Sequence, residues 1–195
     1  MKKLFLTLAL VAAGFCGTQA HAEWITKENI GEKLLWYIPN RFADAFDTFS
    51  VALGVGPVVE ARLMATRAID FGLGVGMTAK AYKTHNRQYG LGIEEGWYWS
   101  FIVGAEDYVI SDTTPLVQEF STAYPVDDLW VGFPLPNERV YDFFDGPRDY
   151  WAIGGSLGLF IDGDLYVHPL ELVDFVLGFF LIDIKDDDFT MDDFR

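Results

Sequence analysis

The chain has 195 residues and a formal net charge of −15, with 29 acidic residues against 14 Lys and Arg. Such an excess of negative charge repels phosphate backbones and excludes nucleic acid as a partner. The one cysteine, Cys16, lies near the N-terminus, so cysteine chemistry and an internal disulfide are excluded for the rest of the chain. Hydrophobic residues make up 51% of the sequence, which indicates very apolar elements joined by acidic loops.

The first 22 residues have the pattern of a secretory signal peptide. Lys2 and Lys3 precede an apolar run from Leu4 to Phe15, and Ala20-His21-Ala22 supplies the small residues that signal peptidase reads. The apolar run is shorter than the roughly 20 residues that a membrane-spanning helix needs. We therefore expect cleavage before Glu23 and export to the bacterial envelope, in the outer membrane or the periplasm.

Two segments have helical periodicity. Residues 27–38 place Ile30, Leu34, Leu35 and Ile38 on one face, and Pro39-Asn40 is expected to end this short N-terminal helix. A second helix is expected to open at Pro169, and residues 170–182 are apolar nearly all round. Residues 184–195 form an acidic tail.

Between the helices, the hydrophobic period is two, which predicts strands. Gly56-Pro57 is expected to separate two of the early strands, and 80–88 to form a polar turn. Asp162-Gly163 has the composition of a hairpin turn between the last two strands. The predicted strands lie at 51–55, 59–65, 69–79, 89–93, 97–103, 150–161 and 164–168.

Residues 105–149 lose this alternation and contain five prolines, so they are expected to form a long, partly irregular excursion. The fold class predicted is mainly β: an antiparallel curved sheet or small, partial β-barrel, with a packed C-terminal helix and a short N-terminal helix. Residues 23–183 are expected to form a single β-rich domain.

The two faces of the predicted strands differ sharply. One face of 69–79 is Ile, Phe, Leu, Val and Met, and the other contains Gly72, Gly74 and Gly76. Glycine weakens a strand, so repeated glycines indicate that something approaches that face closely: a packed helix or the crowded interior of a small barrel. The apolar face requires either a second protein layer or lipid.

The sequence offers weak signals for a site. Arg62, Arg67 and Glu94 are expected to share the glycine-lined face, where they would form a polar interior or binding cluster, with Arg62 and Glu94 as a candidate ion pair. His85 and His168 are far apart in sequence, and no Ser-His-Asp order or metal spacing can be read from them. No catalytic residue, metal site or cofactor is predicted.

Several motifs resemble those of a group of uncharacterised exported bacterial proteins with glycine-rich strands and a closing C-terminal helix. The resemblance covers most of the chain outside 105–145, and it implies an architecture but no activity. The motifs are Asn40-Arg41…Asp44…Asp47, Gly54-Val55-Gly56-Pro57, Ala65-Thr66-Arg67…Gly72…Gly74, Asp149-Tyr150-Trp151-x-Ile153-Gly154 and Pro169-x-Glu171…Asp174-Phe175…Gly178…Ile182-Asp183.

The function expected from the sequence is that of a non-catalytic, outer-membrane-associated envelope protein that is structural or lipid-interacting. Its partners would be outer-membrane lipid or another envelope protein, and its oligomeric state is left open. One alternative is a soluble periplasmic small barrel that binds an apolar ligand. Another is a hydrolase that uses carboxylates alone, with candidates at Glu106, Asp107, Asp127 and Asp128.

Overall fold

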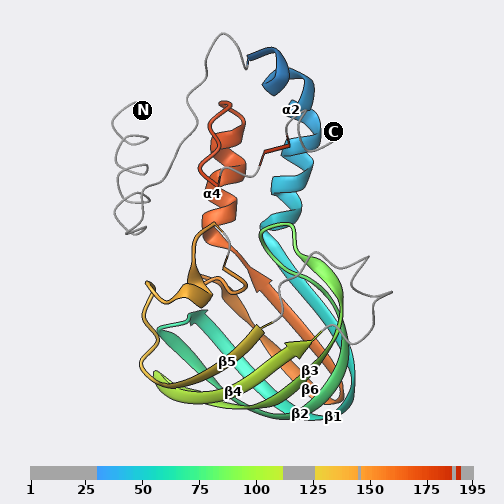
Figure 1. The fold of residues 1–195 in the computed structure, drawn as a ribbon, viewed down its shortest axis with the longest axis vertical. Helices are drawn as coiled ribbons and strands as arrows, with labels where there is room; N and C mark the ends of the chain where they lie inside the picture. The colour runs from blue at the N-terminus through green and yellow to red at the C-terminus, as the bar shows by residue number, and fades with distance from the viewer. Residues whose placement is uncertain (1–29, 112–125, 145, 186–187, 190–195) are drawn as a thin grey trace. The chain divides into compact units, whose positions relative to one another are not determined.

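The computed structural model describes residues 30–111, 126–144, 146–185 and 188–189. The fold is mainly β, as predicted, with six antiparallel strands in one curved sheet (Figure 1). In chain order the elements are α2 (Ile30–Asp47), β1 (Phe49–Thr66), β2 (Ile69–Lys83), β3 (Tyr89–Phe101), β4 (Val103–Ser111), β5 (Val126–Gly132), the 3-10 turn η1 (Arg139–Tyr141), β6 (Ile153–Val167) and α4 (Pro169–Gly178). The predicted signal peptide lies outside the described residues.

The sheet has the strand order β5-β4-β3-β2-β1-β6, and no pairing closes β5 onto β6 among the described residues. The chain divides into two compact units. One unit, 46–169, contains the sheet, and the other combines 1–45 with 170–195. All the residues of the site described below belong to the sheet unit.

In the helical unit, α2 and α4 are joined by polar contacts. Arg41 forms an ion pair with Asp44, at 2.6 Å, and a 3.5 Å hydrogen bond to the Phe175 carbonyl of α4. The guanidinium occupies the space beside Gly178, where a Cβ would overlap it. Helix α2 continues through Pro39, whereas the sequence predicted that the helix would end there. The contacts of Arg41 hold the part of the helix that follows Pro39.

Part of the segment predicted to be an acidic tail, 184–195, makes contacts with the two helices. Helix α4 opens at Pro169 as predicted but ends at Gly178, before residue 182. Lys185 is buried, with its ammonium 3.2 Å from Glu171, and the Phe189 amide donates to Asn40 at 2.8 Å.

Two predicted breaks in the sheet are absent, because β1 and β6 each run through the predicted break as one strand. Strand β1 runs through Gly56-Pro57, and its pairing with β6 shifts between Val55 and Val59, a bulge that accommodates a proline with no amide to donate. The hairpin predicted at Asp162-Gly163 is wrong: β6 continues along β1, with Gly54 opposite Asp162.

Two predicted boundaries also move. Strand β2 continues to Lys83, so the turn after it is shorter than 80–88. The region predicted to be irregular, 105–149, contains most of β4 and all of β5. Its alternation was obscured because acids such as Glu106 occupy positions that face the interior.

The sheet is inverted relative to that of a typical water-soluble protein. The polar or small residues of each strand are buried on the concave side, and the apolar ones are exposed on the other. In β2, for example, Asp70 and Thr78 are at most 1% exposed, whereas Leu73 and Val75 are 51% and 58% exposed. In the part of the chain that the structure describes, the apolar side of the sheet is largely exposed.

Candidate functional site

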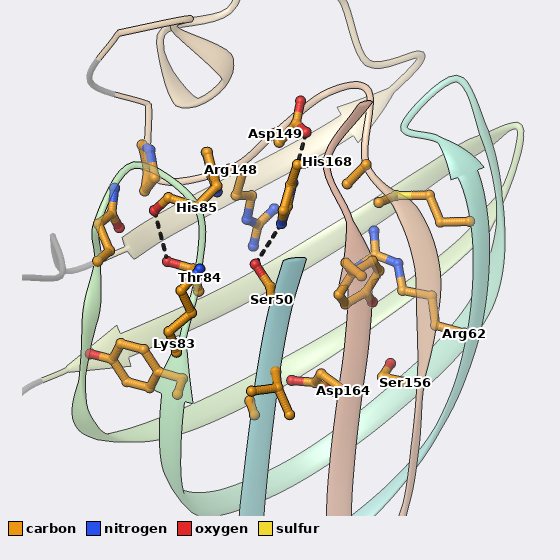
Figure 2. A pocket seen from close by; sticks show the side chains of 18 of the residues that line it. Ser50, Arg62, Lys83, Thr84, His85, Arg148, Asp149, Ser156, Asp164 and His168 are labelled. Carbon is orange, nitrogen blue, oxygen red and sulfur yellow. Dashed lines mark hydrogen bonds and ion pairs between the residues drawn. The ribbon is translucent and has the colours of Figure 1, made fainter. Parts of the chain in front are cut away.

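A cavity of about 180 Å³ lies on the polar side of the sheet (Figure 2). Its lining combines the three residues predicted as a polar cluster, Arg62, Arg67 and Glu94, with two histidines, His85 and His168. Arg62 and Glu94 take different partners from those expected, because Arg62 bonds to Asp70 and Glu94 pairs with Lys80.

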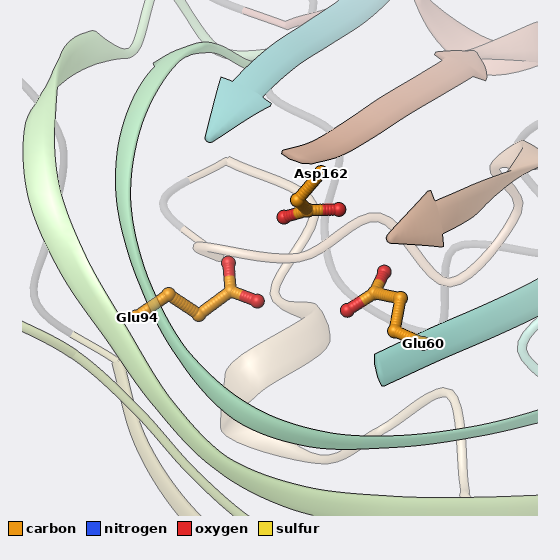
Figure 3. A group of neighbouring side chains, drawn as sticks. All are labelled: Glu60, Glu94 and Asp162. Atoms are coloured by element: carbon orange, nitrogen blue, oxygen red, sulfur yellow. The ribbon is translucent and has the colours of Figure 1, made fainter. Parts of the chain in front are cut away.

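At one end, three carboxylates converge (Figure 3): oxygens of Glu60, Glu94 and Asp162 lie within 4.8 Å of one another. The Lys80 ammonium already supplies positive charge here, 2.7 Å from Glu94 and 2.5 Å from Asp162, where a bound metal ion would otherwise be needed. Lys80 and the four acids around it therefore form a lysine–carboxylate cluster rather than an established metal centre. The acids are Glu60, Glu94, Asp162 and Asp164.

The lysine–carboxylate cluster carries more acid than one ammonium can neutralise. Burial raises the pKa of Glu60 to about 7, against the opposing effects of a hydrogen bond from Ser156 and the charge of Lys80. Burial likewise raises the pKa of Asp164 to about 6, although Lys80 lies 2.9 Å away. Protonation of these acids limits the negative charge inside the sheet near neutral pH.

A second cluster is rich in arginine. Asp70 is fully buried and accepts from both Arg62 and Arg67, and Glu106 lies 3.0 Å from Arg67 and 2.6 Å from Arg148. Burial alone would raise the pKa of Glu106, but Arg148 and Arg67 outweigh it and lower the pKa to about 2. Three guanidinium groups therefore share two carboxylates.

Beside these clusters, Ser50, His168 and Asp149 form a continuous hydrogen-bonded array (Figure 2). Ser50 Oγ lies 2.5 Å from His168 Nε2, and His168 Nδ1 lies 2.8 Å from Asp149 Oδ2. Ser50 and His168 are buried, with exposed fractions of 6% and 3%. All three residues line the cavity.

The strand register explains why residues so distant in sequence meet. Ser50 lies opposite Tyr166 in the β1–β6 pair, so His168 is its diagonal neighbour, two residues further on and on the same face. The His168 amide donates to the Thr48 carbonyl at 2.8 Å, which fixes the backbone just beyond β6. Asp149 is fixed in turn because its Oδ1 accepts from the Trp151 amide at 2.8 Å.

The charge state of Asp149 sets the direction of these hydrogen bonds. Burial would raise the pKa of Asp149, but the hydrogen bond from His168 and the nearby positive charge of His85 and His168 outweigh it and lower the pKa. The ionised carboxylate therefore accepts from Nδ1–H. In a neutral imidazole Nε2 is then the acceptor, and the Ser50 hydroxyl donates a hydrogen bond to it.

Sequence patterns alone did not predict this array. His85 and His168 were not predicted to act together because they are far apart along the chain. In the structure the centroids of their rings lie 4.9 Å apart. The missing step was the β1–β6 pairing, which local periodicity does not reveal. The available signal was a pair of facts: Ser50 lies near the start of the first strand, and His168 directly follows the last one.

The glycine-lined face is crowded, as predicted, by backbone and side chains of the sheet itself. A Cβ on Gly72 would come within 2.9 Å of Arg62, and one on Gly54 within 3.4 Å of Lys80. Gly54 therefore leaves room for the Lys80 side chain and Gly74 for the Tyr98 ring. Beside Gly56, Gly72 and Gly76 the nearest atoms are backbone of the neighbouring strand.

Comparison with known proteins yields no matching family model, no matching curated protein and no matching solved structure. Among the described residues, no helix combines the length and hydropathy that a membrane-spanning helix needs.

Proposed function

We propose that this is an envelope protein associated with the outer membrane, whose sheet contacts lipid acyl chains through its apolar face. The observation that carries the proposal is the inverted sheet. Large apolar side chains are exposed along one side of β1, β2, β3 and β6 while charged ones are buried on the other, as in proteins whose strands face lipid around a polar interior.

The apolar face is too extensive to be an ordinary protein surface. Many large apolar residues on its strands are about half exposed or more. A soluble monomer usually leaves a contiguous apolar patch of only a few hundred Å² uncovered. The exposed apolar residues include Leu53, Val55, Val59, Leu63, Leu73, Val75, Leu91, Phe101, Leu129, Val131, Leu157, Leu159, Ile161 and Leu165.

Strand length is also consistent with lipid contact. A strand needs about 9–11 residues to cross the hydrocarbon layer. The strands β1, β2, β3 and β6 have 18, 15, 13 and 15 residues. Each is therefore long enough to keep an apolar stripe within the acyl layer.

Helix α2 has the same inverted character. Its apolar residues Leu34, Ile38 and Phe42 recur every four positions and are 60–65% exposed, whereas Asn40 and Asp44 are buried. A helix with one such exposed stripe is suited to lie in the interface between lipid headgroups and acyl chains.

The two alternatives from the sequence have weaker support. A soluble barrel that binds an apolar ligand needs an apolar interior, but the cavity is lined by charged residues such as Glu60, Arg62 and Lys80. Of the acids predicted for a carboxylate-only hydrolase, Glu106 is held between two arginines, which suits it to an ion pair rather than proton transfer near neutral pH.

The test is fractionation followed by a lipid-proximity measurement. We expect the protein in the outer-membrane fraction after a urea wash, with release only by detergent. In vesicles, a fluorophore on Leu73→Cys should be quenched by lipids that carry a spin label on the acyl chain. The control is Asn137→Cys, at an exposed polar position outside the strands. Complete recovery in the detergent-free periplasmic extract, or equal quenching at the two positions, would contradict lipid contact.

A further inference from the structure

The Ser50–His168–Asp149 array has the connectivity of a nucleophile, a general base and the group that orients the base. We propose that Ser50 is the nucleophile of an acyl-ester hydrolase site, with His168 as general base and Asp149 as positioning residue. The substrate class is a carboxylic ester of a membrane lipid, and this last step rests on the lipid contact proposed above.

The geometry meets the requirements for activating a serine. The Ser50 to His168 distance of 2.5 Å lies within hydrogen-bond reach, and the Asp149 contact of 2.8 Å holds Nδ1 protonated so that Nε2 faces the hydroxyl. A buried serine that served only to fill space would not need its partner oriented by a carboxylate. The array also borders a cavity, so a reacting group has space beside Ser50.

The reaction follows from these contacts. Ser50 Oγ attacks the ester carbonyl carbon while its proton moves to His168 Nε2, forming a tetrahedral oxyanion. The C–O bond to the alcohol then breaks, the alcohol leaves with the proton from Nε2, and an acyl-Ser50 ester remains. Water attacks this ester with His168 again taking the proton, and the carboxylic acid departs as Ser50 regains its hydrogen.

Two of the cationic side chains around the cavity are also ion-paired, Arg148 with Glu106 and Lys83 with Asp47. Arg148 and Lys83 line the same cavity as Ser50. Fixed charge in a site sheltered from water stabilises a developing negative charge more strongly than it would in bulk solvent.

A second hollow lies on β1, β2 and the start of β3, and it shares lining residues with the polar cavity. It has a volume of about 400 Å³, and it is lined by Leu53, Ala81 and Leu91 together with four residues that also line the polar cavity: Val51, Ala52, Tyr82 and Lys83. Val51, which lines both hollows, is the residue next to Ser50, so an acyl chain in the second hollow would lie beside the strand segment that carries the nucleophile. This arrangement favours a lipid ester over a small polar one.

The role of Asp149 can be separated from a structural one by the pH profile of hydrolysis. In Asp149→Asn the amide cannot hold the imidazole as the carboxylate does, so we expect kcat to fall by about 10³-fold or more. The acid limb of the profile should also move to lower pH. A loss of activity that merely follows a loss of folded protein, with an unchanged profile, would contradict positioning by Asp149.

The nucleophile is tested on the full chain with a fluorophosphonate, which transfers its phosphonyl group to an activated serine as fluoride leaves. We expect peptide mass spectrometry to locate the adduct on Ser50. Labelling should fall at least about 100-fold in Ser50→Ala and in His168→Gln. The matched control is Ser100→Ala, because Ser100 is a buried serine of the same sheet whose hydroxyl donates to the Asp70 carbonyl away from the cavity.

Mapping on the wild type does not depend on how well any variant folds. A folded wild-type protein with no adduct on Ser50, or labelling of Ser50 that persists in folded His168→Gln, would overturn the proposal. Labelling of Ser50 in a protein that fractionates as soluble would support the nucleophile and contradict only the membrane proposal.

The substrate class is tested with vesicles of phosphatidylethanolamine and phosphatidylglycerol beside soluble p-nitrophenyl butyrate. We expect release of free fatty acid and lysophospholipid from the vesicles, abolished in Ser50→Ala. Hydrolysis of the soluble ester alone would retain Ser50 as nucleophile but overturn the lipid substrate. Membrane association with neither labelling nor hydrolysis would overturn the catalytic inference and leave the proposed function standing.

Discussion

The ring of Tyr98 lies directly over Gly74, its partner across the β2–β3 ladder, and a Cβ on Gly74 would stand only 2.4 Å from the ring. The guanidinium of Arg62 stacks on the same ring, 4.9 Å from its centroid. The absence of a side chain at Gly74 therefore allows the interior of the sheet to hold a tyrosine and an arginine side by side.

Gly74→Ala should consequently destabilise the sheet, because Tyr98 is buried against Arg62 and cannot move away without breaking that contact. We expect the free energy of unfolding to fall by about 1–3 kcal/mol, as for overpacking in general. Gly163→Ala is the control, since a Cβ there meets nothing closer than 3.7 Å. Urea titration of both variants checks the difference, and equal midpoints would contradict the crowding argument.

The sequence predicted the two-faced strands, because alternation at 69–79 is unusually regular and sheet faces follow from a period of two. It also predicted that glycines mark a close approach. It failed where pairing partners decide the outcome: Asp162-Gly163 reads locally as a turn, yet both residues lie within a strand because β1 pairs along them.

The candidate site was harder to predict for the same reason. Arg62, Arg67 and Glu94 could be assigned to one face from their own strands, and the structure places all three around the cavity. Ser50, Asp149 and His168 come together only through the pairing of β1 with β6, the first and last described strands along the chain. Near Ser50 the paired residues are more than a hundred positions apart in sequence. Local sequence patterns carry no information about which strands pair over such a large separation along the chain.

The raised pKa of Glu60 makes stability depend on pH. The folded protein holds a proton on Glu60 that the unfolded chain gives up above its ordinary pKa of 4.5, so this residue lowers the free energy of unfolding as pH rises from about 4.5 to about 7. Asp164 acts in the same direction up to about pH 6. Glu60→Gln should therefore gain stability over the wild type at pH 8, by up to about 3 kcal/mol, and much less at pH 4.5.

Urea denaturation of wild type and Glu60→Gln across this pH range measures the effect. Glu95→Gln is the matched control, because Glu95 is an exposed glutamate one residue from the lysine–carboxylate cluster. A difference between Glu60→Gln and wild type that does not grow with pH would refute the buried, protonated state of Glu60.

Glu106 should have the opposite pH dependence. Its pKa is lowered to about 2, so its stabilising contribution is complete above pH 4.5 and is lost as pH falls toward 2. Glu106→Gln leaves the Arg67 and Arg148 charges without their shared partner, and we expect a loss of about 3 kcal/mol at pH 7. The loss should shrink below pH 4.5, whereas Asp107→Asn, at an exposed neighbour, should change little at either pH.

Leu73→Lys distinguishes a lipid-facing surface from a water-facing one. Leu73 is 51% exposed, so in water the substitution removes few contacts and should shift stability by well under 1 kcal/mol. In the acyl layer a lysine near the midplane costs about 2–4 kcal/mol. We therefore expect Leu73→Lys to lower the unfolding midpoint in vesicles and the amount recovered in the outer-membrane fraction. Leu73→Met should leave both unchanged, because it keeps the apolar volume. If the lysine variant assembled into membranes as well as the methionine variant and unfolded at the same urea concentration, position 73 would face water and the lipid assignment of this face would fail.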